Sequence, residues 1–319
     1  MRVIDHINAA AHDGRTAFSF EILPPLKGND ISRVYGIIDR LREFDPKYIN
    51  ITSHRSEVQY QERSDGSIIK KKIRKRPGSV AIASAIQNRY GIIAVPHVIC
   101  KGFTREETEY ALIDLNFLGV HDLLLLQGDA KGPDKSTDAS LINSHATDLQ
   151  AQVNDFNLGI YADGELFEAN ATPFSYGMAC YPEKHEAAPN MESDLRYAKM
   201  KVDNGACYLV TQMFFDNSKY YEFVERCRAA GINVPIIPGI KPIINRSQLT
   251  VLPRVFRSDI PEPLATELAR CKTDEEAREV GVEWSIGQCR DLIAHDVPSL
   301  HFYTLMASDS VRRVAKEIY

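Results

Sequence analysis

The chain has 319 residues, of which 44% are hydrophobic and 25% are charged, a composition typical of an ordinary globular protein. Its formal net charge of −5 argues against a general nucleic-acid-binding surface, because such a surface needs a basic excess. No apolar run is long enough to cross a bilayer, and the N-terminus has no signal-peptide core. We therefore expect a cytoplasmic protein that contacts neither nucleic acid nor a membrane.

The chain begins with a predicted short helix within residues 1–15. A strand follows at Phe18–Leu23, because an alternating apolar run is stopped there by two prolines, Pro24 and Pro25. A helix from about Asn29 to Leu41 and a strand at Tyr48–Thr52 complete a unit of the length that a parallel crossover needs.

Residues 53–78 interrupt this pattern and contain a basic run from Lys70 to Arg76. We interpret the segment as a solvated loop that could order over a bound nucleotide. The alternative is a phosphate-binding or nucleic-acid-binding patch, which a short basic run in an acidic chain supports only weakly.

After residue 78 the alternation of helices and strands resumes. Helices are predicted at Val80–Arg89, Thr104–Gly119, Asp138–Phe156, Ser193–Asn204, Ser218–Ala230 and the C-terminus. Strands are predicted at Ile92–Val98, Asp122–Leu126, Leu158–Tyr161, Cys207–Thr211, Pro235–Pro238 and Ser299–Tyr303. Thr104 and Glu107 form an N-terminal capping box.

Eight strands separated by helices favour an α/β protein with a single-domain (β/α)8 TIM barrel over residues 1–319. An open doubly wound sheet is less favoured, because no G-x-G-x-x-G motif follows a predicted strand. Such a barrel carries its chemistry on the loops at the carboxyl ends of its strands. The polar residues near those ends are Glu21, Thr52, His97, Asp129, Tyr181, His185, Gln212 and the loop 239–248.

These strand-end residues offer acids, amides and aromatic rings but no nucleophile–histidine pair. Glu21 is a candidate proton donor or base, and the alternative is a structural, salt-bridged glutamate. The set also lacks the carboxylate cluster of a metal site, and the six cysteines have no metal-ligand spacing, so we assign no metal. An organic redox cofactor is the plausible carrier of the chemistry.

Seven sequence motifs, in order over about residues 16–306, resemble those of the methylenetetrahydrofolate reductases. They are residues 18–25, 96–97, 127–129, 181–185, 211–216, 237–242 and 301–305. The resemblance implies a barrel that binds FAD and reduces 5,10-methylenetetrahydrofolate to 5-methyltetrahydrofolate with NADH or NADPH in ping-pong order, supplying methyl groups for methionine synthesis. It also implies a homo-oligomer, whose size no sequence feature fixes.

The resemblance assigns a role to several residues. Glu21 matches the general acid that assists opening of the folate's five-membered ring, and a desolvated site would favour its protonated form. Asp129 matches an acid near the flavin that also holds the pterin, and Gln212 and Gln248 match amides that bind the folate. The positions matching FAD contacts are Thr52, His97, Gln127, Gly128, Asp129, Tyr181, His185, Asp194 and Lys201.

The chain departs from the family pattern at several places. Gln127 and Ala307 stand where the family often has arginine, and Arg312 or Arg313 is a candidate replacement for the second of these. The basic segment 64–76 is longer than in compact bacterial members. The chain ends soon after its last predicted strand, so we expect no regulatory domain.

Two other functions stay open at this point. One is another flavin barrel, such as a proline dehydrogenase-like oxidoreductase. The other is a non-catalytic nucleotide- or RNA-binding barrel that uses the run from Lys70 to Arg76. The sequence does not discriminate NADH from NADPH, because it has no Rossmann residues from which to read that preference.

Overall fold

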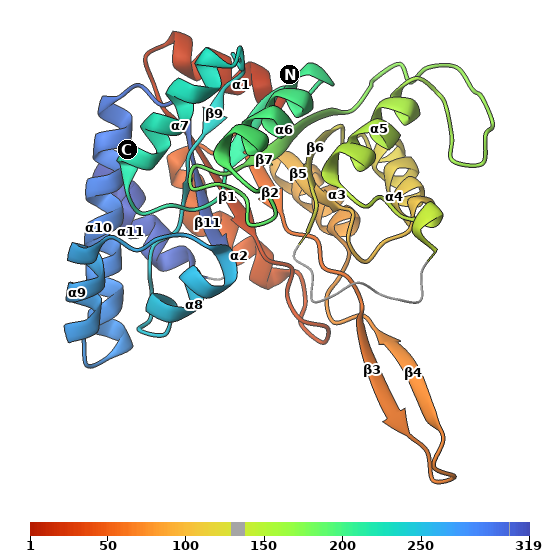
Figure 1. Ribbon diagram of the computed structural model, residues 1–319, viewed down its shortest axis with the longest axis horizontal. Coiled ribbons are helices and arrows are strands. Elements are labelled where there is room, and N and C mark those ends of the chain that lie inside the picture. Colours follow the sequence, from red (N-terminus) through yellow and green to blue (C-terminus); the bar gives the residue numbers. More distant parts are fainter. Residues whose placement is uncertain (129–137, 306) are drawn as a thin grey trace. The chain divides into compact units, whose positions relative to one another are not determined.

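The computed structural model describes residues 1–128, 138–305 and 307–319 (Figure 1). Within these residues, nine parallel strands follow one another in the order β10-β11-β1-β2-β5-β6-β7-β8-β9, with helices between most of them. This nearly closed α/β barrel confirms the predicted (β/α)8 fold class. Asp129, one of the predicted site residues, lies outside the described residues.

The chain divides into two compact units, which we describe separately. Unit 1 comprises residues 1–22, 36–50 and 175–319, and unit 2 comprises residues 23–35 and 51–174. The expectation of one domain over residues 1–319 stays a prediction. No helix in the described ranges is long and apolar enough to span a membrane.

Unit 1 holds both ends of the chain and most of the strands. Its elements are α1 (Val3–His12), β1 (Ala17–Ile22), η1 (Arg42–Phe44), β2 (Tyr48–Ile51), β7 (Ser175–Cys180), α6 (Met191–Asp203), β8 (Tyr208–Thr211), α7 (Asn217–Ala229), β9 (Ile236–Ile237), β10 (Gly239–Ile240), α8 (Gln248–Phe256), α9 (Glu262–Arg270), α10 (Asp274–Ala294), β11 (Ser299–Leu305) and α11 (Ser308–Ile318). Helix α2 (Ser32–Leu41) crosses the boundary between the units, and β2 ends at it.

Unit 2 begins with a hairpin and continues with alternating helices and strands. Its elements are β3 (Glu57–Glu62), β4 (Ile68–Ile73), α3 (Ser79–Tyr90), β5 (Ile93–Ile99), α4 (Arg105–Phe117), β6 (Asp122–Leu126), η2 (Ala139–Leu141) and α5 (Ala146–Asn157). The predicted capping box is confirmed, because Thr104 Oγ1 accepts a 3.0 Å bond from the Glu107 amide and Glu107 accepts one from the Thr104 amide.

The period-2 pattern of β1 separates an apolar face from a polar face. Phe18 packs against Phe20 and against Phe302 of β11, with ring centroids 5.7 and 5.5 Å apart. On the other face, Ser19 lies beside His301, and Glu21 follows two residues later. Strand β1 therefore anchors Glu21 through a buried aromatic core on the opposite face.

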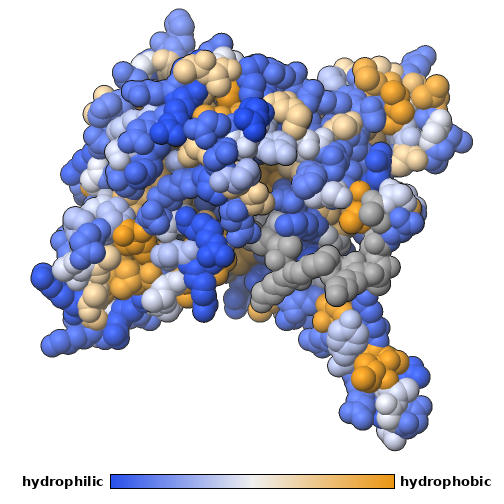
Figure 2. All heavy atoms as spheres, in the orientation of Figure 1, coloured by the Kyte–Doolittle hydropathy of each residue, from blue (hydrophilic) through white to orange (hydrophobic). Residues whose placement is uncertain are grey.

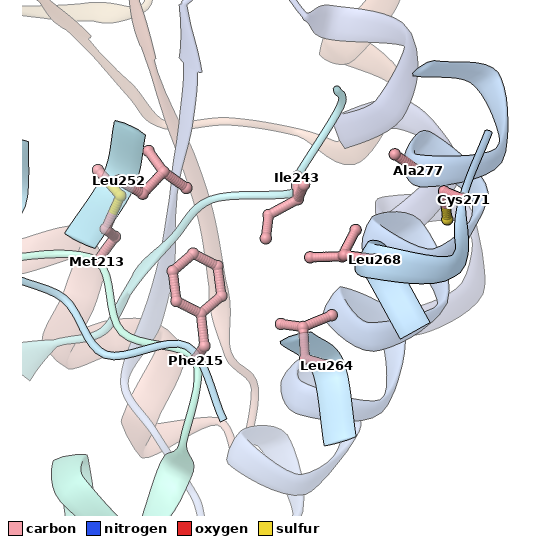
Figure 3. Close-up of a cluster of buried hydrophobic side chains, with 8 residues drawn as sticks. All are labelled: Met213, Phe215, Ile243, Leu252, Leu264, Leu268, Cys271 and Ala277. Atoms are coloured by element: carbon pink, nitrogen blue, oxygen red, sulfur yellow. The ribbon is translucent and has the colours of Figure 1, made fainter. Parts of the chain in front are cut away.

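A second hydrophobic cluster of unit 1 supports the loops that follow β8 and β10 (Figure 3). In Figure 3, Phe215 and Ile243 point toward Leu264 and Leu268 of helix α9. The cluster consists of Met213, Phe215, Ile243, Leu252, Leu264, Leu268, Cys271 and Ala277. Burial of these side chains fixes the loops close to two predicted folate-binding amides.

Within the segment interpreted as a solvated loop, residues 53–78, residues 57–73 instead form a β-hairpin of antiparallel strands β3 and β4 (Figure 1). The alternation of polar and apolar residues was hidden there by the lysines of the basic run, which lie on β4 with exposed side chains. Hydrophobic and hydrophilic residues lie side by side on the hairpin (Figure 2), and Tyr60 and Ile68 are 72% and 69% exposed.

The strand predicted at Leu158–Tyr161 is wrong. Helix α5 ends at Asn157, and Gly159 takes a left-handed conformation with φ of 79°, so the apolar run belongs to a helix-terminating turn. Ile160 makes only an isolated bridge to Leu166. The fifth barrel strand along the chain is β7, which the sequence analysis did not predict.

The helix predicted at Asp138–Phe156 begins later than expected. Asp138 instead caps the short helix η2, by accepting a 2.9 Å bond from the Ser140 amide. The carboxylate of Asp148 accepts bonds from the amides of Ser144 and His145, so that α5 begins at Ala146.

Candidate active site

Glu21 of β1, Tyr303 of β11 and Lys241, the residue after β10, each directly follow a residue that belongs to the same row of strand pairs, Phe20, Phe302 and Ile240. The three strands pair in parallel up to these preceding residues, so the next residue on each comes close to the next residue on its neighbour. Glu21 and Lys241 are only 5% and 4% exposed. We call this set the Glu21–Tyr303–Lys241 row.

The pairing of β1 with β11 is irregular beside Glu21. The register shifts between Phe20 and Ile22, which pair with Phe302 and Leu305, so β11 has one residue more than β1 at this level. Leu305 has a φ of 51°, an uncommon left-handed conformation for a leucine. Such bulges re-aim side chains and occur beside active sites, as expected for the carboxyl end of a barrel strand.

Tyr303 and Lys241 are tied to the backbone around them. Lys241 Nζ donates a 3.1 Å hydrogen bond to the carbonyl of Tyr303, and the Tyr303 hydroxyl donates to the carbonyl of Thr211 at the end of β8. Thr211 Oγ1 in turn accepts a 2.9 Å bond from the Gly239 amide. Residues of β8, β10 and β11 are thus joined through side chains.

Burial and charge act on the titratable groups of the row. Burial lowers the pKa of Lys241 to about 8, and the charge of Glu21 partly opposes this shift. Burial, followed by the charge of Glu21, raises the pKa of Tyr303 well above its ordinary value. A neutral tyrosine and a lysine with a pKa of about 8 therefore lie on one side of Glu21.

His301 lies one level below the row and is 1% exposed. Ser19 Oγ donates to the carbonyl of Leu300 and lies 2.9 Å from His301 Nδ1, so Nδ1 carries the ring proton. Within the described residues, His301 Nε2 has no hydrogen-bond partner. Burial lowers the pKa of His301 to about 3, and the imidazole is therefore neutral.

A second group in unit 1 comprises Tyr181, His185, Asp194 and Lys201, which we call the Tyr181 group. Tyr181 directly follows β7, and its ring lies 4.6 Å from that of His185. Asp194 accepts a 2.8 Å bond from the His185 amide. The structure therefore brings together these four predicted FAD contacts.

Lys201 completes the Tyr181 group from helix α6. Its Nζ donates a 2.8 Å bond to the carbonyl of Ala179 and lies 5.9 Å from the centre of the Tyr181 ring. Burial lowers the pKa of Lys201, while the charges of Cys180 and Asp194 oppose this shift. An enclosed ammonium beside an aromatic ring suits a ligand with anionic or carbonyl oxygens.

The two predicted folate-binding amides occupy fixed positions in unit 1. Gln212 directly follows β8, and its Oε1 accepts a 2.9 Å bond from the Met213 amide. Gln248 is the first residue of α8, and its Oε1 accepts a 2.7 Å bond from the Ile244 amide. Because each oxygen is used within the protein, each amide presents its NH₂ donors to a ligand.

The remaining predicted contacts lie in unit 2. Thr52 directly follows β2 and its Oγ1 lies 3.1 Å from His54 Nε2. Gln127 and Gly128 directly follow β6, and Gln127 Nε2 donates a 3.3 Å bond to the carbonyl of Ser144. His97 lies near the carboxyl end of its strand, as in the predicted strand Ile92–Val98. It lies inside β5, paired with Leu124, and is 6% exposed.

The two arginines considered as replacements at Ala307 have other partners. Arg312 Nε donates a 2.6 Å bond to Glu43, and Arg313 forms a bidentate pair with Glu279. Sequence reasoning also missed Lys241 and Tyr303 as site residues. The sequence did contain a signal that Lys241 belongs to the site. Residues 239 and 241 are two positions apart in an extended segment, so they share a face.

Comparison with known proteins identifies the family. The family model for methylenetetrahydrofolate reductase matches residues 6–319. The chain belongs to the methylenetetrahydrofolate reductase family. Its match to methylenetetrahydrofolate reductase (NADH) 1 of Arabidopsis thaliana is 31% identical and covers 97% of this chain but 49% of that protein.

Members of the family from bacteria are matched over most of their length. The 5,10-methylenetetrahydrofolate reductase of Escherichia coli is 30% identical to this chain. The match covers 92% of this chain and 87% of the Escherichia coli protein. By contrast, the chain spans about half the length of the plant relatives that it matches.

One solved structure supports the fold at low sequence identity. It is described as an uncharacterized protein from Clostridium thermocellum that binds two copies of 5-methyl-5,6,7,8-tetrahydrofolic acid. The TM-score is 0.58 at 14% identity, with 98% of this chain and 99% of that chain covered. At this identity the likeness supports the barrel fold alone.

Proposed function

We propose that this chain is an FAD-dependent reductase that converts 5,10-methylenetetrahydrofolate to 5-methyltetrahydrofolate, with NADH or NADPH as donor, in ping-pong order. It would thereby supply methyl groups for methionine synthesis. The observation that carries the proposal is the 5% exposed carboxyl of Glu21 at the carboxyl end of β1, where the family resemblance puts the acid. The family match favours this function over a proline dehydrogenase-like alternative.

In the proposed reaction Glu21 gives a proton to the folate nitrogen that leaves when the five-membered ring opens. Gln212 and Gln248 would orient the pterin through their NH₂ donors, since both Oε1 atoms accept backbone bonds. Asp129 would hold the pterin as well, although it lies outside the described residues. Glu21 is only 5% exposed, so it has little contact with bulk water.

The residues proposed to hold FAD fit such a ligand. In unit 1 the Tyr181 group offers an aromatic ring and an enclosed ammonium with three donors. The proposed contacts in unit 2 are Thr52, His97, Gln127 and Gly128, together with Asp129. Bound FAD would supply hydride acceptance from the nicotinamide and hydride donation to the folate.

The visible spectrum of the purified protein tests this proposal under anaerobic conditions. We expect a flavin band that NADH or NADPH bleaches and that 5,10-methylenetetrahydrofolate restores. Comparing the two nicotinamides at equal concentration also gives the donor preference. A protein that cannot be reconstituted with FAD, or whose reduced flavin is not reoxidised by the folate, would contradict the proposal.

We also propose that the protein acts as a homo-oligomer in the cytoplasm and does not bind nucleic acid. The exposed lysines of β4 make the last point testable, because phosphate contacts give binding that weakens steeply with salt. We expect no binding of a random oligonucleotide at moderate salt. Light scattering of the purified protein would measure the number of copies.

A further inference from the structure

Lys241 is an unusual residue for its position. A lysine side chain is almost never fully buried unless it is paired, yet Lys241, directly after β10, is 4% exposed. Its ammonium donates a 3.1 Å hydrogen bond to the carbonyl of Tyr303. A neutral carbonyl does not balance the charge of a buried ammonium, so a charged partner is needed.

Glu21 meets that need. It lies two strands away from Lys241 across β11, and strands are spaced about 4.8 Å apart, a span that the two long side chains can bridge. The charge of Glu21 raises the pKa of Lys241 against the effect of burial. Because such coupling is reciprocal, the ammonium favours the ionised form of Glu21 equally.

Two other titratable groups that lie in or beside this row in the part of the chain that the structure describes, Tyr303 and Cys180, carry no charge near neutral pH. Tyr303, from β11, has its pKa raised by burial, and so does Cys180 at the end of β7. Lys241 and Glu21 are therefore the two groups of opposite charge in this row.

We propose that Lys241 is a positioning residue for Glu21: its ammonium group orients the Glu21 carboxyl and sets the pH range in which that carboxyl can hold a proton. The idea that Glu21 uses this proton on the folate rests on the proposed function, but the pairing itself does not. The protonation of Glu21 in this chain therefore depends on Lys241 as well as on desolvation, because the Lys241 ammonium favours the ionised carboxylate.

Three substitutions separate the charge of Lys241 from its hydrogen bond. Lys241→Met removes both and keeps the length of the side chain, Lys241→Gln keeps a donor for the Tyr303 carbonyl, and Lys241→Arg keeps the charge. Lys316→Met, on the exposed side of α11, controls for loss of a lysine elsewhere in unit 1.

The first measurement uses the protein without folate or nicotinamide. Glutamate carboxyls labelled with ¹³C are titrated by NMR, and Glu21→Gln assigns the signal of Glu21. In Lys241→Met and Lys241→Gln we expect Glu21 to titrate about one pH unit or more higher than in the parent, as loss of a near opposite charge predicts. Lys241→Arg and Lys316→Met should leave the titration within a few tenths of a unit. An unchanged Glu21 titration in Lys241→Gln overturns the proposal, even if Lys241→Met fails to fold.

The second measurement separates this proposal from the proposed function. The rate of flavin reoxidation by methylenetetrahydrofolate should fall as pH rises through the titration of Glu21, and Lys241→Gln should move that fall to higher pH. Flavin reduction by the nicotinamide should not move. A shifted NMR titration without a shifted rate profile supports the pairing and contradicts the role of Glu21 as the folate acid.

Discussion

Gly239 lies so close to Tyr303 that a side chain at position 239 has no room. A Cβ atom there would come within 2.4 Å of the Tyr303 ring, 2.7 Å of its hydroxyl oxygen and 2.5 Å of the Thr211 carbonyl. Two residues later the same strand segment presents Lys241. The spacing of the Glu21–Tyr303–Lys241 row therefore depends on a backbone approach that only glycine permits.

Gly239→Ala should consequently displace Tyr303 and disturb the row. We expect a loss of about 1–3 kcal/mol in the free energy of unfolding, as for other overpacked sites, together with slower folate turnover. Gly287→Ala is the matched control, because Gly287 lies in α10 with open space around its Cβ position. That control should gain about 1 kcal/mol or less. Urea denaturation followed by the fluorescence of Trp284, the single tryptophan, measures both. Equal stabilities of the two variants would contradict the close approach.

His301 should make folding stability depend on pH. Its pKa is about 3 in the folded protein and has an ordinary value of 6.5 when exposed, so the unfolded chain binds more protons between these values. Stability should therefore fall as pH is lowered from 6.5 toward 3, with this residue contributing about 1.4 kcal/mol per pH unit.

His301→Gln keeps a hydrogen-bond donor for Ser19. This variant should lose the part of the pH dependence of folding stability that His301 contributes. His12→Gln is the control, because the His12 side chain is 90% exposed. Denaturation curves at several pH values give the comparison. If the free energy of unfolding of His301→Gln changes with pH between 4 and 6.5 as steeply as that of the parent, His301 is not a buried neutral imidazole.

Lys201 should hold the cofactor rather than the fold. Lys201→Met removes an enclosed ammonium beside Tyr181, and we expect FAD to bind about tenfold more weakly or worse, as for a lost hydrogen bond to a charged group. Equilibrium dialysis against FAD measures the affinity, and Lys316→Met serves again as the control. Unchanged FAD affinity in a folded Lys201→Met protein would exclude Lys201 as a contact.

The sequence predicted the strand ends better than it predicted the strands. Tyr181 and Gln212 directly follow β7 and β8, as expected of barrel site residues, although β7 itself was not predicted. That strand contains Gly177, which weakens the strand pattern. The opposite error occurred at Leu158–Tyr161, where a strand was predicted and none formed. A short apolar run there also fits a helix C-terminus that ends at Gly159 in a left-handed conformation.

Lys241 could not be assigned as a partner of Glu21 from the chain alone. The pairing depends on the registers of β1 and β10 with β11, and these bring together residues that are far apart in the sequence. The three helices between residues 248 and 294 were likewise not predicted. Their role is tertiary, since Trp284 and Gln288 of α10 donate to the carbonyls of Phe215 and Phe214 after β8.

The measurement that tests the central claim most directly is a comparison of the two half-reactions in Glu21→Gln. Reduction of the flavin by the nicotinamide should proceed at nearly the parent rate, because that step needs no proton from residue 21. Reoxidation by methylenetetrahydrofolate should slow about 10²- to 10⁴-fold, the range for loss of a general acid. Reoxidation at the parent rate would contradict the assignment of Glu21 as the acid.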